Sequence, residues 1–262
     1  AAKYGAMFIF LPIGDKGVPE TAEERCKLVE QVYGEAKRHG LEKKDMVIDA
    51  LVLTVSSNQK AAVETLNVID WCSNIFSCNT IIGLSNVSFG LPERNWINTS
   101  FLAMAIGRGL TMAIANPSNH ILMNIKMASD VLMNNDINSE KYIARFGEGV
   151  PKGTDDEKEQ GSMTITQQIY DAVVKGRRER INELIDNALN QKVDANNLVT
   201  DVLVPAITYV GDLFEQRKYY LPQLIQSAET MKKGFEKLEP VLSAQKKDGQ
   251  KEKVKIVLAT VK

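Results

Sequence analysis

Four polar side chains interrupt or follow short apolar runs in the first half of the chain. They are Asp15, Asp49, Asn86 and Asn116. Ligands of α/β proteins bind at the carboxyl ends of the strands. If the apolar runs are strands, these residues are therefore candidates for one shared site. Asp49 and Asn86 together could bind a ligand that has both donors and acceptors, because a carboxylate accepts hydrogen bonds whereas an amide both donates and accepts them.

Two interpretations of Asp49 and Asn86 are open from the residues alone. An unpaired carboxylate within the apolar run VIDALVL would be costly, so Asp49 must be hydrogen-bonded, either to the protein or to a ligand. Asn86 could equally satisfy its own backbone in a turn, which is the commoner use of asparagine there. As ligand-binding groups, the pair suits a flat heterocycle with an amide–amidine edge, such as a pterin.

The runs that lead to these residues are continuously apolar, as in strands that are buried on both faces of a parallel sheet. Helix-like segments lie between them, which predicts an α/β fold of four βα units with right-handed crossovers. The predicted strands are 6–12, 46–53, 80–85 and 110–116, and the predicted helices are 20–38, 58–76, 98–108 and 117–146.

The second half of the chain has a purely helical period. Residues 147–163 are rich in Gly, Pro and charge, which indicates a linker. Four helices with short connections then favour an up-down bundle. They are expected at 164–175, 177–190, 195–216 and 221–245. The predicted domains are thus 1–146, a linker 147–163, a helical domain 164–247, and a segment 248–262 that holds a linker and one strand, VKIVLATV.

Both ends of the chain look abrupt. Four βα units are half of a closed eight-stranded barrel, and an open half would leave two apolar edges. A single strand near the C-terminus has nothing to pair with. We therefore expect this chain to be a piece of a longer polypeptide.

Composition excludes several classes of protein. The 32 basic and 33 acidic residues give a net charge of −1, which offers no basic face for nucleic acid. No apolar run approaches the roughly 20 residues of a membrane span. Cys26, Cys72 and Cys78 are too few for a disulfide framework, and a reducing, cytoplasmic compartment fits best. On one predicted helix, Cys72 and Cys78 would face apart, so we expect plain core or surface thiols.

Three segments resemble known families. GLSNVSFGLPERNWINTSFLAMAI and VIDALVL are similar to the pterin-binding barrel of methyltetrahydrofolate methyltransferases. Residues 201–232 resemble the helical cap of a cobalamin-binding module, and KVKIVLATVK resembles the first strand of a corrinoid-binding Rossmann-like domain. This order is that of the cobalamin-dependent methionine synthases. The resemblance implies the C-terminal half of a pterin-binding (β/α)8 barrel, then a four-helix cap.

The resemblance also implies roles for individual residues in the barrel. Asp49 matches the aspartate that binds the amino-pyrimidinone edge of the pterin, and Asn86 matches the asparagine near N5, which carries the methyl group. Arg94 and Ile114 match a basic residue and an apolar wall residue of the same site. Phe89 matches a position that is Phe in methionine synthases and polar in some stand-alone methyltransferases.

In the cap, three apolar residues match those that cover the upper face of the corrin. Phe214, Leu221 and Ile225 are seven and four residues apart, a helical spacing if the turn between them is set aside. Ordinary bundle-core residues would show the same spacing, so the residues alone leave that alternative open.

The implied reaction is methyl transfer from 5-methyltetrahydrofolate to cob(I)alamin and, as methylcobalamin, on to homocysteine. N5 must gain positive character before it can leave, and Asn86 would stabilise that charge while Asp49 orients the ring. Three expected parts are not in this sequence: the first half of the barrel, which supplies further pterin ligands, the Asp-x-His-x-x-Gly cobalt-ligand motif, and the zinc-cysteine module for homocysteine, the one place where zinc is expected. We therefore expect this chain by itself to be inactive.

Two other functions fit the same residues. One is a methyltetrahydrofolate:corrinoid protein methyltransferase without homocysteine chemistry. The other is a non-catalytic corrinoid carrier with a degenerate barrel. The expected partners are methyltetrahydrofolate, homocysteine through the missing module, and the remaining domains of the parent chain, with no nucleic acid and no membrane.

Overall fold

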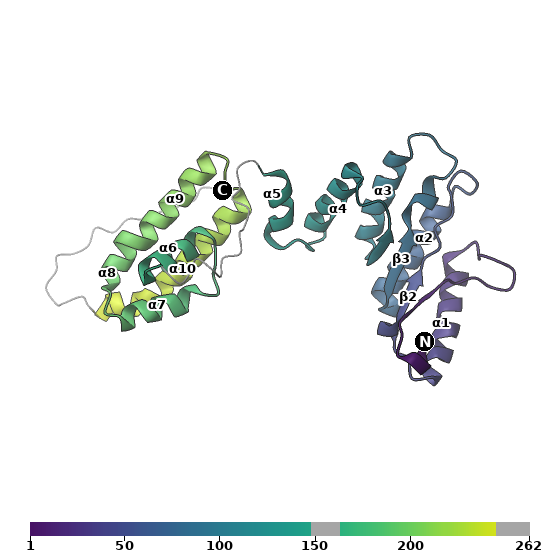
Figure 1. The fold of residues 1–262 in the computed structure, drawn as a ribbon, viewed down its shortest axis with the longest axis horizontal. Coiled ribbons are helices and arrows are strands. Elements are labelled where there is room, and N and C mark those ends of the chain that lie inside the picture. Colours follow the sequence, from purple (N-terminus) through teal and green to yellow (C-terminus); the bar gives the residue numbers. More distant parts are fainter. Residues whose placement is uncertain (148–162, 245–262) are drawn as a thin grey trace, which may run out of the picture. The chain divides into compact units, whose positions relative to one another are not determined.

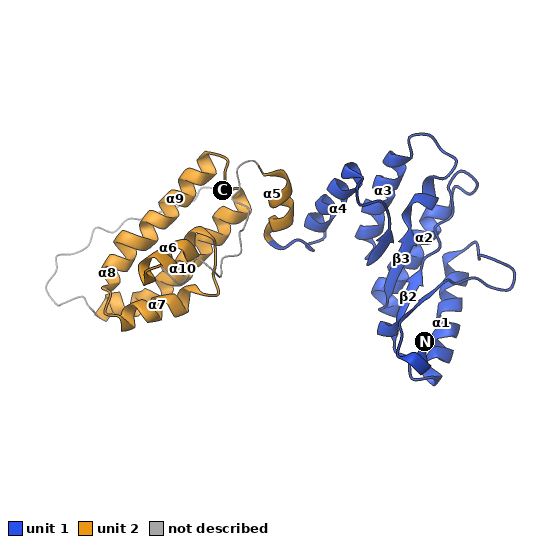
Figure 2. Ribbon diagram, in the orientation of Figure 1, with its two compact units in different colours: residues 1–137 blue, residues 138–262 orange. Residues whose placement is uncertain are grey.

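The computed structural model describes residues 1–147 and 163–244 and divides the chain into two compact units, 1–137 and 138–262 (Figure 2). The predicted strand at 254–261 and nearly all of both predicted linkers lie outside the described residues. Each unit is treated by itself below.

The first unit contains a four-stranded parallel sheet in the order β1-β2-β3-β4 (Figure 1). The strands are β1 (Phe8–Phe10), β2 (Met46–Asp49), β3 (Asn79–Gly83) and β4 (Met112–Ile114). The prediction of four parallel strands joined by helices is confirmed. The strands are shorter than the apolar runs. After β2 the run continues into a buried loop, Ala50–Val52, whereas β4 and the residues that follow it are exposed.

Helices follow each of these strands: α1 (Ala22–Arg38), α2 (Ala61–Trp71), α3 (Arg94–Gly107) and α4 (His120–Leu132). Sequence explains several of their ends. The Thr21 hydroxyl accepts the Glu24 N–H at the start of α1, and the Asn119 side chain caps α4 through the Leu122 N–H. A further short helix, α5 (Glu140–Phe146), is assigned to the second unit.

The two faces of the sheet differ. Met46, Ile48 and Ile82 are fully buried in a core that also contains residues of α1, α2 and α3. Side chains alternate between the faces of a strand, so the register places Asp49, Ile81 and Met112 in one row on the opposite face. On that opposite face Ile9 and Ile114 are exposed. The helices therefore cover one face and leave the face of Asp49 accessible.

The prediction that Cys72 and Cys78 lie on one helix and face apart is wrong. After α2 a π-helical segment, Cys72–Phe76, ends at Ser77 with φ 59°. This left-handed residue turns the chain back, and the Cys78 N–H donates to the Cys72 carbonyl at 3.0 Å. A hydrogen bond between the two thiols raises the pKa of Cys72 and lowers the pKa of Cys78.

The second unit is helical, with α6 (Ile165–Val174), α7 (Ile181–Asn190), α8 (Ala195–Asn197), a π-helical segment Leu198–Leu203, α9 (Val204–Glu215) and α10 (Leu221–Ala244). Four predicted helices match this order, the third being α8 to α9. In Figure 1, α6, α7, α9 and α10 lie together. Their core includes Ile185, Leu203 and Leu238, each fully buried. A Cβ on Gly234 of α10 would meet the Ile185 Cδ1 atom at 3.2 Å, so a glycine here permits close packing against α7.

One described helix, Ala195–Glu215, has the length and composition of a membrane span. A third of its apolar window is buried within the unit, and core helices of soluble proteins pass the same test. Sequence inspection finds no uninterrupted run here, because Asp201 and Asp212 lie within the segment.

Candidate functional site

Asp49 is the last residue of β2, and the loop behind it fixes its carboxylate. The Leu51 N–H donates to Oδ1 of Asp49 at 2.9 Å, which closes an Asx turn. Leu51 has φ 57°, a left-handed conformation that is costly for a side chain other than glycine. Burial raises the pKa of the Asp49 carboxyl above its ordinary value, and the Leu51 N–H offsets part of that rise. One carboxylate oxygen is thus held by the backbone, and Oδ2 is left for another donor.

Two buried side chains hold the Leu51 turn, and no local sequence pattern predicts either role. Arg25 of α1 donates through Nη1 to the carbonyls of Ala50 and Leu51 at 3.1 and 3.0 Å. The Thr65 hydroxyl of α2 shares its one proton between the Leu51 carbonyl at 3.1 Å and the Ala61 carbonyl of its own helix at 3.0 Å. Both side chains are fully buried. An arginine beside acidic residues in the first turns of a helix is normally read as an exposed ion-pair partner, which is why sequence inspection passed over it.

Asn86 lies in a short 3₁₀ segment, Leu84–Ser88, directly after β3. A Cβ built on Gly83 would lie 3.0 Å from the Asn86 Nδ2 atom. Gly83 pairs with Ile114 and lies two residues beyond Ile81, so its missing side chain would point to the face that carries Asp49. The Asn86 amide therefore folds over the end of β3 on that same face. Among the described residues, its side chain has no hydrogen-bond partner.

Hydrogen bonds join the loop after β2 to the loop after β3. The Val55 N–H donates to the Val87 carbonyl at 3.0 Å, and the hydroxyls of Thr54 and Ser56 both donate to the Phe89 carbonyl, at 2.6 and 2.8 Å. The loops that carry Asp49 and Asn86 are thus one hydrogen-bonded assembly. Phe89 itself is 67% exposed.

Arg94, the first residue of α3, braces the Asn86 loop from its other side. It donates to the Ser85 carbonyl at 2.6 Å and to the Ser88 hydroxyl at 3.0 Å, and its guanidinium lies 5.9 Å from the centre of the Phe89 ring. The structure therefore gives Arg94 a supporting role for the segment on either side of Asn86. Its predicted contact with a pterin stays a prediction.

The remaining predicted residues of this unit lie at the end of β4. Ile114 is 65% exposed on the open face of the sheet, opposite Gly83. Asn116 accepts the Ser118 N–H at 2.9 Å with its side chain, which is a local turn. Asp49, Asn86 and Ile114 are thus brought to one edge and face, whereas Asn116 is used by its own backbone.

In the second unit, the three predicted cap residues lie at the ends of two helices. Phe214 is near the end of α9, and Leu221 and Ile225 are in the first turns of α10. Their spacing is therefore not one helical stripe, because Arg217, with φ 57°, reverses the chain between the helices. The three side chains are 39%, 57% and 48% exposed, so they are not bundle-core residues.

A pocket of about 640 Å³ includes Phe214 and Leu221 in its lining, together with Glu215, Arg217, Tyr219, Tyr220 and Phe146. The Tyr219 hydroxyl donates to the Val174 carbonyl at 3.1 Å, which anchors this turn to α6. An open face with fixed, exposed apolar side chains fits a large planar ring such as a corrin. The residues present therefore fit the expected cofactor.

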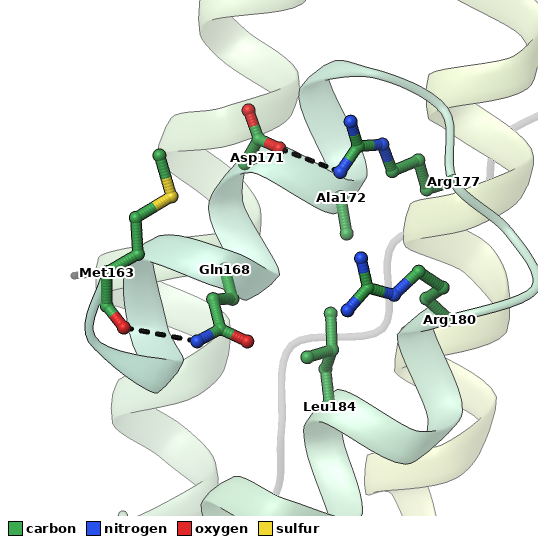
Figure 3. A pocket seen from close by; sticks show the side chains of 7 residues that line it. All are labelled: Met163, Gln168, Asp171, Ala172, Arg177, Arg180 and Leu184. Carbon is green, nitrogen blue, oxygen red and sulfur yellow. Dashed lines mark hydrogen bonds and ion pairs between the residues drawn. The ribbon is translucent and has the colours of Figure 1, made fainter. Parts of the chain in front are cut away.

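A second pocket in this unit is structural. Figure 3 shows it between α6 and the start of α7, with Arg177 directed to Asp171 at 3.4 Å and Gln168 donating to the Met163 carbonyl at 3.1 Å. Its volume is about 10 Å³, the space of roughly one water molecule, so it cannot hold a substrate. Across residues 1–147 and 163–244 no group of His, Cys, Asp and Glu is arranged to hold a metal ion.

Comparisons with known proteins match part of each unit to a known family. Residues 12–116 match the family described as pterin binding enzymes, and residues 165–239 match the B12 binding domain. Methionine synthases from Mycobacterium tuberculosis and Mycobacterium leprae are each 28% identical over 100% of this chain, which covers 23% of their length. A methylcorrinoid:tetrahydrofolate methyltransferase from Eubacterium limosum is 31% identical over 51% of this chain and 49% of its own length. The chain spans about a quarter of the methionine synthases it matches.

Proposed function

We propose that this chain is part of a protein that transfers a methyl group between a folate and cobalamin, because residues 12–116 match pterin binding enzymes and residues 165–239 match the B12 binding domain. The observation that supports this most is the convergence of Asp49 and Asn86 on the open face of the sheet, at the carboxyl ends of β2 and β3. We place the pterin-binding domain at 1–146, as part of a (β/α)8 barrel, and the cobalamin cap at 164–247.

Asp49 is assigned the recognition of the pterin. Its Oδ1 is occupied by the Leu51 N–H, so Oδ2 is directed to the N–H donors of the amino-pyrimidinone edge. A carboxylate that is partly desolvated forms stronger charge-assisted hydrogen bonds than one in water. The role of Asp49 is to hold the ring in one orientation, which is a positioning contribution.

Asn86 is assigned to the methyl-bearing N5. A tertiary amine leaves only when N5 gains positive character, and an amide beside N5 stabilises the proton or hydrogen bond that supplies it. The side chain suits this role because it makes no other hydrogen bond among the described residues and is held over Gly83 by the loop. Arg94 and Phe89 fix that loop, and Ile114 forms an apolar wall.

Cobalamin, when bound, supplies the metal centre that accepts the methyl group. Phe214, Leu221 and Ile225 would cover one face of its ring and exclude water from the reactive side, and this cover must move aside for chemistry. Homocysteine as the final acceptor, zinc activation in a separate module, and a cytoplasmic location belong to the same proposal. The similarity to methionine synthases supports methionine formation, and the zinc module and the cytoplasmic location are what the resemblance of the sequence implies.

A test compares Asn86→Ala with Asn74→Ala, an exposed asparagine in the π-helical segment before β3. Methyl transfer from methyltetrahydrofolate to reduced cobalamin is followed by absorbance, and folate binding is measured by calorimetry. We expect Asn86→Ala to lower the transfer rate about 10²–10³-fold, with a much smaller loss of binding. The Asn74→Ala variant should match the wild type. Equal loss of transfer and binding in Asn86→Ala would contradict the role at N5.

The relative from Eubacterium limosum favours a second candidate, a folate–corrinoid methyltransferase without homocysteine chemistry. Its similarity covers about half of this chain, whereas similarity to the methionine synthases covers all of it. Formation of methionine from homocysteine by the full-length parent polypeptide, with methylcobalamin supplied, separates the two. Methyl transfer to cobalamin without methionine formation would support the second.

A further inference from the structure

Arg25 is a buried charge with an unusual set of partners. Its side chain is fully buried, and its hydrogen bonds within the described residues go to backbone carbonyls. Nε donates to the Pro19 carbonyl at 2.9 Å, and Nη1 donates to Ala50 and Leu51. Burying an arginine is costly, and an apolar residue of similar volume would fill the same core at lower cost. Packing alone therefore does not explain why a charged side chain occupies this position.

The backbone that Arg25 holds is strained. Leu51 adopts φ 57°, a left-handed conformation that is unfavourable for a residue with a side chain. Arg25 and Thr65 both donate to the Leu51 carbonyl, and Arg25 also holds the carbonyl before it. With these carbonyls fixed on the core side, the Leu51 N–H is turned toward Asp49 Oδ1. The guanidinium stabilises the one conformation in which this hydrogen bond forms.

We propose that Arg25 is a positioning residue for the pterin, acting through the Leu51 turn to fix the Asp49 carboxylate at the carboxyl edge of the sheet. The proposal rests on the proposed function, because it assumes that Asp49 binds the ligand. Arg25 does not touch the ligand. Its contribution is to reduce the number of orientations that the carboxylate explores before binding.

The decisive variant is Arg25→Lys, because it keeps the positive charge but cannot place planar donors on three carbonyls at once. The matched control is Arg38→Lys on the same helix, where the arginine is exposed and pairs with Glu35. The first measurement needs no ligand: the pKa of Asp49 followed by carbon NMR of its carboxyl group. Since the Leu51 N–H lowers that pKa, a loosened turn should raise it further in Arg25→Lys and leave it unchanged in Arg38→Lys.

The second measurement is the affinity for methyltetrahydrofolate by calorimetry, in the wild-type and Asp49→Ala backgrounds. Arg25→Lys should weaken binding about tenfold when Asp49 is present and have no further effect when it is absent. A loss of similar size in both backgrounds, or a lowered unfolding midpoint with unchanged affinity and unchanged Asp49 pKa, would overturn the proposal and leave Arg25 as a structural link between α1 and β2.

Two further outcomes can be told apart: a wild type that binds no folate, and an Arg25→Lys variant that does not fold. If the wild type binds no folate, the proposed function fails, and a raised Asp49 pKa in Arg25→Lys would then show only that Arg25 orders the turn, which overturns its role in pterin binding. If Arg25→Lys does not fold, Thr65→Val replaces it, since this variant removes the other donor to the Leu51 carbonyl. An unchanged Asp49 pKa in Thr65→Val would then reject the inference, and a smaller rise in the same direction would support it.

Discussion

The two units use opposite kinds of side chain at their candidate sites. In the α/β unit the site consists of polar groups at strand ends: the Asp49 carboxylate accepts the Leu51 N–H, and the Asn86 amide lies on a loop that other residues hold through hydrogen bonds. In the helical unit the site consists of exposed apolar side chains at helix ends, Phe214, Leu221 and Ile225, beside a separate packed core. A polar site needs geometry that the fold must enforce, whereas an apolar face needs only rigid helices behind it.

This difference predicts that binding and stability separate cleanly in the helical unit. Leu238 and Leu221 both lie on α10, but Leu238 is fully buried and Leu221 is 57% exposed. We expect Leu238→Ala to reduce the free energy of unfolding by about 2–5 kcal/mol, through lost burial and a cavity. Leu221→Ala should change it by less than about 0.5 kcal/mol.

Urea unfolding followed by circular dichroism measures both effects, and cobalamin binding followed by absorbance gives the complementary result. Leu221→Ala should weaken cobalamin binding although it leaves the unit folded. If Leu221→Ala destabilised the unit as much as Leu238→Ala, the exposed leucine would be part of the core after all, and the comparison between face and core would fail.

In the α/β unit the corresponding prediction concerns Gly83. An added methyl group would lie 3.0 Å from the Asn86 amide nitrogen, and the amide must move because the other side of the contact is backbone. Gly83→Ala should therefore lower methyl transfer, by up to about a hundredfold, and change the unfolding midpoint little, since φ at this position is −82°.

Gly107→Ala is the control for Gly83→Ala. Gly107 ends α3, and a Cβ there meets no atom within 4 Å. At saturating folate, Gly107→Ala should transfer methyl groups at the wild-type rate, so the two variants should differ by the whole loss expected for Gly83→Ala. Equal rates would mean that the Asn86 amide relocates without loss, and that its place over Gly83 has no catalytic importance.

The parts of this arrangement that sequence can predict are those that depend on local patterns. Continuous apolar runs identified the four strands, and the polar residues at their ends identified Asp49 and Asn86 as neighbours. The left-handed Leu51 could not be predicted, because leucine rarely adopts positive φ and a distant arginine stabilises it there. Cys78 was misplaced for a similar reason, since one left-handed serine reversed the chain. Conformations that tertiary contacts impose leave no local signal.

The smallest predicted effect concerns the stability cost of the polar site. Burial raises the pKa of Asp49, so the folded protein favours the protonated carboxyl. Ionisation of Asp49 therefore costs stability, and this cost appears as the pH rises through its pKa. Asp49→Asn, whose amide oxygen still accepts the Leu51 N–H, should raise the free energy of unfolding at neutral pH by less than about 1 kcal/mol after solvent screening.

That gain should disappear as the pH falls below the Asp49 pKa, where wild type and variant are both uncharged at this position. Thermal unfolding of both proteins across the acidic and neutral range tests it, with folate binding measured in parallel. Binding by the wild type should weaken over the same acidic range and binding by Asp49→Asn should be weak throughout. A midpoint difference that does not depend on pH would show that Asp49 ionisation carries no cost. The polar site would then reduce the stability of its unit no more than the apolar site does.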